Sequence, residues 1–263
     1  MNIQVEGEEP KKYVPSVIAK HDAAPPPVRV VVLLPTHETM EAGFAFDLQK
    51  MMLRMGASVV ADGIMDVRTF MLMGTLITFA RNDILKDAMQ RTDATHYLFM
   101  DTDHRFPWQS LLRLLSANKD IVGVNYSVRK GTPRSTAFLD LEESDEKLRF
   151  LQPAPEGADK ENQYVKVDAV GMGMTLIRAH VFDAIEFPWF ETVYDKVNRK
   201  WVGEDVDFCN KARAAGFDIW VDTLLSEEIA HIGRFDYRLD HVRALNEAHS
   251  DIAEENAPLI VAP

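Results

Sequence analysis

The chain has 263 residues, of which 46% are hydrophobic and 27% are charged, a balance typical of a globular protein. Its formal net charge of −12 at pH 7 argues against a broad surface for nucleic-acid phosphates. The single cysteine, Cys209, excludes a disulfide framework within the chain and indicates a reducing compartment.

The first residues show no pattern of a signal peptide. The longest apolar stretch, FMLMGTLITFA at 70–80, is too short to span a bilayer, so we expect no membrane span and predict that this stretch packs in the interior. We therefore expect a soluble, cytoplasmic protein.

Three parts of different character divide the chain. The segment 1–27 is polar and ends in AAPPP, which cannot enter a helix, so we interpret it as an extended tail. The segment 28–235 has the pattern of a folded domain. The segment 236–263 is predicted to be a C-terminal helix followed by a tail.

Strands and helices alternate through the first half of this domain. VRVVVLLP at 28–35 predicts a strand covered on both faces, because it is a run rich in β-branched residues. Apolar residues then recur at helical spacing from Phe44 to Met55, and Gly56 is expected to end that helix. Further strands are predicted at 58–65, 96–101 and 120–127, and further helices at 80–91 and from Pro107 onward.

The second half is less regular. Residues 132–162 are polar and interrupted by proline and glycine, which predicts loops or a small excursion from the sheet. Strand character returns at 164–179 and 218–222. Between them, a helix is predicted from Asp205 to Gly216, with Phe208, Ala212 and Ala215 facing inward. The alternation predicts an α/β fold with a Rossmann-like, mostly parallel central sheet flanked by helices, plus a small antiparallel extension.

Two aspartates follow the apolar strand HYLFM. Asp101 and Asp103 stand where ligands of open α/β sheets bind, beyond the carboxyl ends of the strands. Their mutual repulsion is relieved by a divalent cation. Oxygen ligands suit Mg²⁺ or Mn²⁺, and an imidazole in the ligand set favours Mn²⁺. The alternative is a solvated turn, because Asp-x-Asp is a short motif.

Two further elements carry candidate groups. In WVGEDVDFCNKARAAGF at 201–217, Glu204 and Asp205 follow a glycine at a helix start, where acids commonly cap the helix. One acid is enough for capping, which leaves the other free to point into a cleft. His231, in EEIAHIG, is either a packing or surface residue or a partner of the two aspartates.

Taken in order, these pieces resemble nucleotide-sugar-dependent glycosyltransferases of the GT-A fold, in the family-2-like group of bacterial and phage enzymes. The matching pieces lie between residues 28 and 233, and they are LLPTHE, FARNDIL, YLFMDTDHRFP, VGMGMTLIRAHVF, GEDVDFCNKARAAGFDIWVD and AHIG. In the family they correspond to the nucleotide-edge loop, the helix start near the nucleotide, the metal-binding Asp-x-Asp, the acceptor-side strand, the helix with the acceptor carboxylate, and the late histidine.

The resemblance implies transfer of a sugar from a UDP- or GDP-linked donor to an acceptor hydroxyl, with Mn²⁺ or Mg²⁺ as cofactor. The implied metal ligands are Asp101, Asp103 and His231. The implied donor contacts are Pro35, Thr36, Glu38, Arg81, Asp101, Gly171 and Gly173.

The resemblance also implies that Asp205 takes the acceptor proton and that Glu204 contacts the acceptor. The reverse assignment stays open, as does a retaining reaction in which both acids only position substrates.

The loop NYSVRKGTPR brings Arg129, Lys130 and Arg134 close to the expected cleft. They are either solvated or contact the donor phosphates or an anionic acceptor. The acceptor is a glycan or a hydroxylated nucleic-acid base, since phage enzymes of this kind act on hydroxymethylated DNA. The oligomeric state stays open.

Two rival functions remain. A nucleotidyltransferase also places carboxylates and a metal at a strand end, but it usually has a basic, glycine-rich loop where this chain has the acidic LLPTHETMEAG. A non-catalytic module that binds a nucleotide-sugar or a glycan would keep the same fold without turnover.

Overall fold

The computed structural model describes residues 27–59, 65–74, 76–129, 134–140, 149–150, 163–196 and 199–233. The predicted C-terminal helix and tail at 236–263, nearly all of the predicted tail at 1–27, most of 132–162 and Lys130 lie outside the described residues. The domain boundaries therefore stay predictions.

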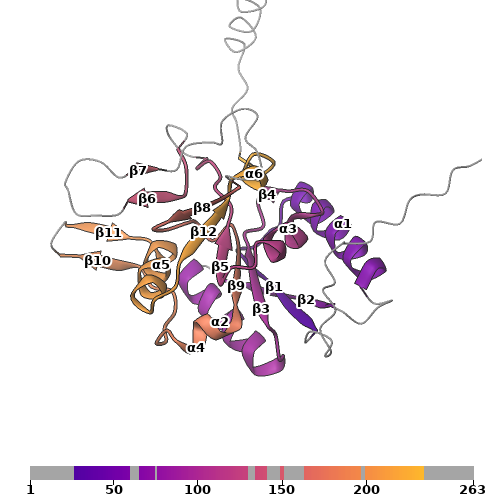
Figure 1. The fold of residues 1–263 in the computed structure, drawn as a ribbon, viewed down its shortest axis with the longest axis horizontal. Coiled ribbons are helices and arrows are strands. Elements are labelled where there is room, and N and C mark those ends of the chain that lie inside the picture. The colour runs from indigo at the N-terminus through magenta and orange to yellow at the C-terminus, as the bar shows by residue number, and fades with distance from the viewer. Residues whose placement is uncertain are drawn as a thin grey trace, which may run out of the picture.

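Seven strands form the central sheet in the order β2-β1-β3-β9-β5-β12-β8 (Figure 1). Their bounds are β1 Val28–Thr36, β2 Met65–Met73, β3 His96–Met100, β5 Ile121–Gly123, β8 Tyr164–Val167, β9 Met174–Arg178 and β12 Ile219–Asp222. β1 is parallel to β2 and β3, and β5 is parallel to β12. β9 is antiparallel to β3 and β5, and β8 is antiparallel to β12. The predicted α/β class with a mostly parallel sheet is confirmed.

Helices cover both faces of this sheet. α1 (Ala42–Val59) and α3 (Ser110–Ser116) contribute to one buried cluster, together with Val30, Val32 and Leu34 of β1. α2 (Ile77–Arg91), α4 (Ala179–Asp183) and α5 (Glu204–Ala214) contribute to the other, together with Val31 and Leu33. Since successive side chains of a strand point to opposite faces, the run Val30–Leu34 of β1 is apolar at every position.

Three small antiparallel sheets complete the fold. β4 (His104–Arg105) pairs with β13 (Ala230–His231), β6 (Phe138–Asp140) with β7 (Arg149–Phe150), and β10 (Val193–Asp195) with β11 (Lys200–Val202). A short helix, α6 (Thr223–Ser226), follows β12. The predicted antiparallel extension is therefore present. No helix among the described residues is long and apolar enough to cross a membrane.

The second strand differs from the prediction. The strand expected at 58–65 is instead β2 at Met65–Met73, and α1 runs through Gly56 to Val59. The reason is the position of β2 at the edge of the sheet. An edge strand is only partly covered, so it does not need the continuous apolar run that marks a central strand.

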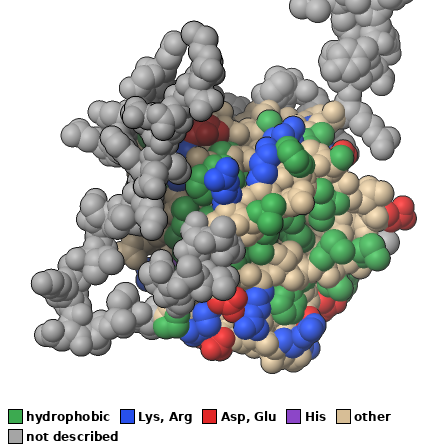
Figure 2. All heavy atoms as spheres, turned by 90° about the vertical axis from the view of Figure 1, so that its right-hand side faces the viewer, with side chains coloured by type: hydrophobic (Ala, Val, Ile, Leu, Met, Phe, Trp, Pro, Cys, Tyr) green, Lys and Arg blue, Asp and Glu red, His purple; other side chains and the backbone are tan. Residues whose placement is uncertain are grey.

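The prediction that FMLMGTLITFA packs in the interior is wrong for most of its large hydrophobic side chains. More than half of the side chain is exposed at Met71, Met73, Leu76 and Phe79. Phe70 and Leu72, in contrast, pack against the core. Figure 2 shows hydrophobic side chains spread over the face that carries α1 and β2.

Two predicted helices need smaller corrections. The helix expected from Pro107 begins at Ser110, whose backbone N–H donates to the Pro107 carbonyl in a preceding turn. The helix expected at 205–216 ends as predicted. Gly216 has φ +92°, and the Phe217 N–H donates to the Ala212 carbonyl, which is the Schellman end of a helix. Ala215, predicted to face inward, is exposed.

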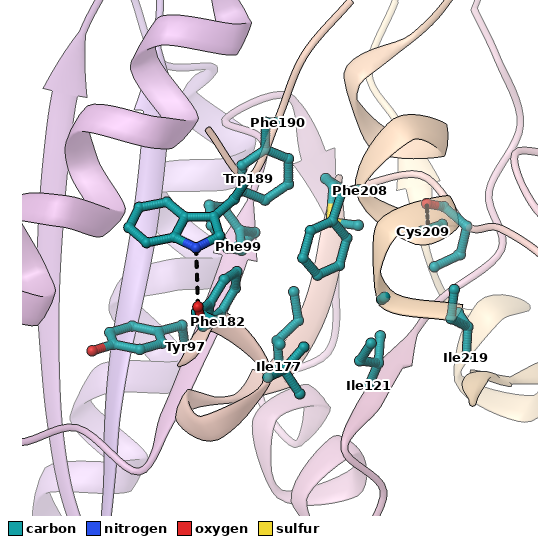
Figure 3. Close-up of a cluster of buried hydrophobic side chains, with 14 of the residues drawn as sticks. Tyr97, Phe99, Ile121, Ile177, Phe182, Trp189, Phe190, Phe208, Cys209 and Ile219 are labelled. Atoms are coloured by element: carbon teal, nitrogen blue, oxygen red, sulfur yellow. Dashed lines mark hydrogen bonds between the residues drawn. The ribbon is translucent and has the colours of Figure 1, made fainter. Parts of the chain in front are cut away.

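An aromatic cluster fixes α4 and α5 against the sheet (Figure 3). The ring of Phe182 lies 5.6 Å from Phe208 and 5.8 Å from both Tyr97 and Trp189, measured between centroids. Trp189 Nε1 donates to the Phe182 carbonyl at 3.1 Å. The start of α5, which carries Glu204 and Asp205, is therefore tied to a rigid core.

Asn82 joins α2 to the segment that follows α4. Its Nδ2 donates to the carbonyls of Thr78 (2.8 Å) and Phe190 (2.7 Å), and its Oδ1 accepts from the backbone N–H groups of Trp189 (3.0 Å) and Phe190 (3.2 Å). One buried amide thus satisfies four backbone groups. Its neighbour Arg81 is held in place by the same anchor.

We predict that Asn82→Ala lowers the free energy of unfolding by about 3 kcal/mol, because it leaves buried backbone groups without hydrogen-bond partners. Chemical denaturation measures this change. Asp83→Ala, at the neighbouring exposed position, is the matched control and should change stability by less than about 0.5 kcal/mol. Equal stabilities of the two variants would contradict the anchoring role of Asn82.

Candidate active site and metal centre

The candidate site lies at the carboxyl end of β3. The backbone N–H of Asp101 donates to the Gly173 carbonyl at 2.9 Å, which continues the pairing of β3 with β9. The chain then turns at Thr102, whose Oγ1 lies 3.2 Å from Oγ1 of Thr36 at the end of β1. Asp101 and Asp103, on either side of this turn, contact two different groups of side chains.

Asp103, His104 and His231 form the first group, which we call the Asp–His–His group. His104 and His231 are paired residues of the two-residue β4–β13 ladder, and the Ile232 N–H donates to the Asp103 carbonyl at 2.7 Å. The two imidazole rings stack at 4.5 Å, 13° from parallel. One ligand atom from each of the three residues lies within 4.8 Å of the others.

Positive and polar groups surround the Asp103 carboxylate. Oδ2 lies 2.5 Å from Arg129 Nη1 and 3.4 Å from His231 Nε2, and Oδ1 lies 3.2 Å from His104 Nδ1. Burial alone would raise the pKa of Asp103, but the contacts with both histidines hold this pKa well below its ordinary value. The contact with Asp103 raises the pKa of His231. Asp103 is therefore ionised.

Several buried atoms of this group lack hydrogen bonds. Asp103 Oδ1 and both ring nitrogens of His104 have no hydrogen-bond partner among the described residues, because the 3.2 Å contact between Oδ1 and Nδ1 lacks hydrogen-bond geometry. Such atoms carry a desolvation cost, which a bound cation would remove. A carboxylate with two imidazoles fits a divalent ion, and this ligand set favours Mn²⁺ over Mg²⁺.

Arg81 is the centre of the second group, which we call the Arg81 group. Its side chain is only 4% exposed. Nη2 donates to Asp101 Oδ1 at 3.1 Å, and Nε donates to Glu204 Oε1 at 3.3 Å. Nη1 is buried and has no hydrogen-bond partner in the described part of the chain. The guanidinium charge is thus matched by two carboxylates, and one N–H group remains for a ligand oxygen.

Asp205 lies beside Glu204 in the first turn of α5. Its Oδ1 accepts a hydrogen bond from the Val206 N–H at 2.8 Å. Burial and the neighbouring Glu204 raise the pKa of Asp205 to about 6. A carboxylate with a pKa near the working pH suits a general base. Asp205 is thus chemically able to act as a base, whereas Glu204 is paired with Arg81.

Tyr126 connects the two groups. Its ring contacts His104 and His231 edge-on, with centroids 4.5 and 5.5 Å apart, and its hydroxyl accepts from the Gly173 N–H at 3.1 Å. Burial, together with Asp101 and Asp205, raises the pKa of Tyr126. The hydroxyl therefore keeps its proton.

Gly171 and Gly173 make room for this tyrosine. A Cβ at either position would lie 2.5–2.6 Å from the Tyr126 hydroxyl oxygen, and one at Gly173 would also lie 2.7 Å from His104 Cε1. Their lack of side chains has a packing reason in the protein itself. A contact of either glycine with a donor sugar stays a proposal.

The other residues that the sequence predicts for the site lie at the end of β1 or after β5. Pro35 and Thr36 are buried at the end of β1, and Glu38 is exposed just beyond it. Arg129 contacts Asp103. Arg134 is exposed, and its carbonyl accepts from the Val128 N–H at 2.9 Å.

Sequence reasoning missed three residues of the site. His104 and Tyr126 are described above. The third is Asp47 of α1, which is buried, lies 2.6 Å from Arg105 Nε and accepts from the Phe106 N–H at 3.3 Å. Against the effect of burial, Arg105 lowers the pKa of Asp47. Asp47 thereby holds β4, the strand that presents His104. The only sequence signal was the place of His104 directly after the Asp-x-Asp motif.

Comparisons with known proteins found similarity to solved structures only. No family model matches the sequence, and no curated protein matches it. A197 from STIV is similar with a TM-score of 0.47 and 14% identity, over 80% of this chain and 97% of A197. GalNAc-T7, solved with UDP, GalNAc and Mn²⁺, is similar with a TM-score of 0.49 and 12% identity, over 80% of this chain and 44% of that protein.

S. aureus TarS 1–349, solved in complex with UDP-GlcNAc, is similar with a TM-score of 0.41 and 14% identity. The similarity covers 81% of this chain and 60% of that one. The identity of the chain to each of these three structures is 14% or less.

The pKa of Asp205 predicts a pH dependence of stability. A folded pKa of about 6 against an ordinary 3.8 means that the folded state binds more protons than the unfolded state between these pH values. The contribution of Asp205 to stability is therefore lost as the pH rises through this window. Relative to wild type, Asp205→Asn should gain about 2 kcal/mol of unfolding free energy between pH 4 and pH 7.

Denaturant unfolding in EDTA at several pH values measures this difference, with Asp83→Asn as a control at an exposed position. A difference between Asp205→Asn and wild type that does not change with pH would show that the environment of Asp205 does not raise its pKa.

Proposed function

We propose that the protein is a metal-dependent glycosyltransferase that moves a sugar from a nucleotide-diphosphate-sugar to an acceptor hydroxyl. The observation that carries this proposal is the Asp–His–His group, whose buried ligand atoms lack partners. It lies next to a buried set of carboxylates around Arg81, with Tyr126 in contact with the histidines and electrostatically coupled to Asp101 and Asp205.

In this proposal, Asp103, His104 and His231 hold a divalent cation, Mn²⁺ before Mg²⁺. Such a cation neutralises, as a Lewis acid, the charge of the departing nucleoside diphosphate. This ligand set replaces the one expected from sequence, because Asp101 is already paired with Arg81 and His104 offers two ring nitrogens without partners.

We assign Asp101 and Arg81 to the donor. Arg81 orients the Asp101 carboxylate and offers its free Nη1–H group to a donor oxygen. Its burial and its two carboxylate partners argue against a role of Arg81 as the main cation for the donor phosphates. Pro35, Thr36 and Glu38, at and beyond the end of β1, are assigned to the nucleoside side.

Asp205 is the proposed base. Its carboxylate accepts the proton of the acceptor hydroxyl while that oxygen bonds to the anomeric carbon and the bond from this carbon to the diphosphate oxygen breaks. This displacement inverts the anomeric configuration. Glu204 contacts the acceptor from its position beside Arg81. In a retaining reaction, both acids would only position the substrates.

The deciding experiment identifies the product. The full chain is incubated with Mn²⁺, UDP- and GDP-sugars, and either glycans or hydroxymethylated DNA as acceptors. A parallel incubation contains nucleoside triphosphates and sugar phosphates instead. Release of a nucleoside diphosphate with a sugar on the acceptor supports the proposal. Release of pyrophosphate from a nucleoside triphosphate and a sugar phosphate would establish a nucleotidyltransferase instead. Binding without any product would establish a non-catalytic binding module.

Two variants separate binding from chemistry. Asp103→Asn should weaken Mn²⁺-dependent binding of UDP or GDP by about 10–100-fold in calorimetry, since it removes a charged ligand. Asp205→Asn should keep that binding while transfer falls by about 10²–10⁴-fold. In wild type, the transfer rate should rise with pH around pH 6, following the raised pKa of Asp205.

Asp83→Asn serves as the common control at an exposed position of α2. Unchanged nucleotide binding in Asp103→Asn would remove Asp103 from the metal centre. Simultaneous loss of donor binding and transfer in Asp205→Asn would assign that residue to the donor rather than to the acceptor.

A further inference from the structure

Among the described residues, the shortest ion pair of the Asp–His–His group is made with a residue outside it. Arg129 Nη1 lies 2.5 Å from Asp103 Oδ2, the oxygen that also lies 3.4 Å from His231 Nε2. The same Nη1 donates to the Ile232 carbonyl at 3.2 Å. The guanidinium is therefore placed over the carboxylate oxygen that a metal ion would use together with His231.

We propose that Arg129 is a displaceable counter-ion of the metal centre. It neutralises Asp103 when no cation is bound, a divalent cation displaces it, and the displaced guanidinium then binds the diphosphate of the donor. This inference rests on the proposed function, because it presupposes a cation at the Asp–His–His group and an anionic ligand beside it.

Arg129 and a divalent cation compete for Asp103, because both are positively charged and both contact the same carboxylate. A carboxylate oxygen that binds a metal ion directly cannot keep a guanidinium in bidentate or close contact at the same lone pairs. The two cations also repel each other at this short range, and the partly buried site screens the repulsion less than water does. Binding of the cation therefore requires Arg129 to move.

Arg129 is able to move, whereas Arg81 is not. The Arg129 side chain is 45% exposed and lies on the segment after β5. The Arg81 side chain is 4% exposed and contacts both Asp101 and Glu204. Movement of Arg129 leaves Asp103 in contact with His104 and His231. Movement of Arg81 would instead break its contacts with both Asp101 and Glu204.

The displaced guanidinium makes the two ligands cooperative. A diphosphate near the cation offers Arg129 a new anionic partner, since guanidinium groups bind phosphate oxygens strongly. Nucleotide binding then removes the competitor of the cation. By linkage, the factor by which the nucleotide raises cation affinity equals the factor by which the cation raises nucleotide affinity.

The test measures binding of Mn²⁺ to the full chain by the EPR signal of free Mn²⁺, without and with saturating UDP or GDP. For wild type, the nucleotide should raise Mn²⁺ affinity by about tenfold or more, within the usual range of such coupling. Arg129→Gln should bind Mn²⁺ alone about tenfold more tightly than wild type, and the nucleotide should raise its affinity by a smaller factor than in wild type.

Two matched variants serve as controls. Arg129→Lys keeps a cation on the same stem and should bind Mn²⁺ more like wild type than Arg129→Gln does. Lys119→Gln removes one positive charge beside Trp220, 3.8 Å from its ring centroid, and should leave Mn²⁺ affinity unchanged. Thermal unfolding of each variant verifies that the chain is folded before titration.

The outcomes separate this inference from the proposed function. If Arg129→Gln and wild type bind Mn²⁺ alone equally, or if Lys119→Gln gains as much affinity as Arg129→Gln, then Arg129 is not the competitor, while the metal centre stands. If neither wild type nor Arg129→Gln binds Mn²⁺ even with nucleotide, the metal centre itself fails, and both proposals fall.

Discussion

The pairing of buried Arg81 with Asp101 and Glu204 is the interaction on which the arrangement of the site depends. These residues belong to α2, to the end of β3 and to the start of α5. A guanidinium removed from water must have its charge matched, and losing one partner of a buried ion pair is strongly destabilising. The three elements are therefore fixed relative to one another. The orientation of Asp101, and with it the turn to Asp103, follows from this constraint.

Sequence patterns were sufficient to predict the layers of the fold and the acidic residues of the candidate site. A continuous apolar run such as Val30–Leu34 of β1 is recognisable because both faces of the strand are covered. The pair Asp101 and Asp103 is recognisable because charges at a strand end are unusual. The end of α5 at Gly216 followed from glycine's access to positive φ. In each of these cases the physical requirement is local, so that it leaves a trace in neighbouring residues.

The features that sequence did not reveal depend on contacts between distant segments. His104 is a candidate ligand only because it pairs with His231 in a two-residue ladder. His231 lies far from it along the chain. The sequence around Tyr126 does not indicate a role for it, because Gly171 and Gly173, which lie beside its hydroxyl, are distant in the chain. The edge position of β2 was also not predictable, because a local sequence pattern does not determine the order of strands in a sheet. These are properties of topology, which periodicity does not encode.

The shortness of β13 has a consequence for how the proposed centre exchanges its ion. His231 is held by a two-residue ladder, by the Ile232 N–H bond to Asp103 and by its own contact with the Ser127 carbonyl. None of these belongs to the seven-stranded sheet. Small structures of this kind open far more often than the cores they border. Local opening of β13 would therefore separate His231 from Asp103 without breaking the pairing of β3 with β9.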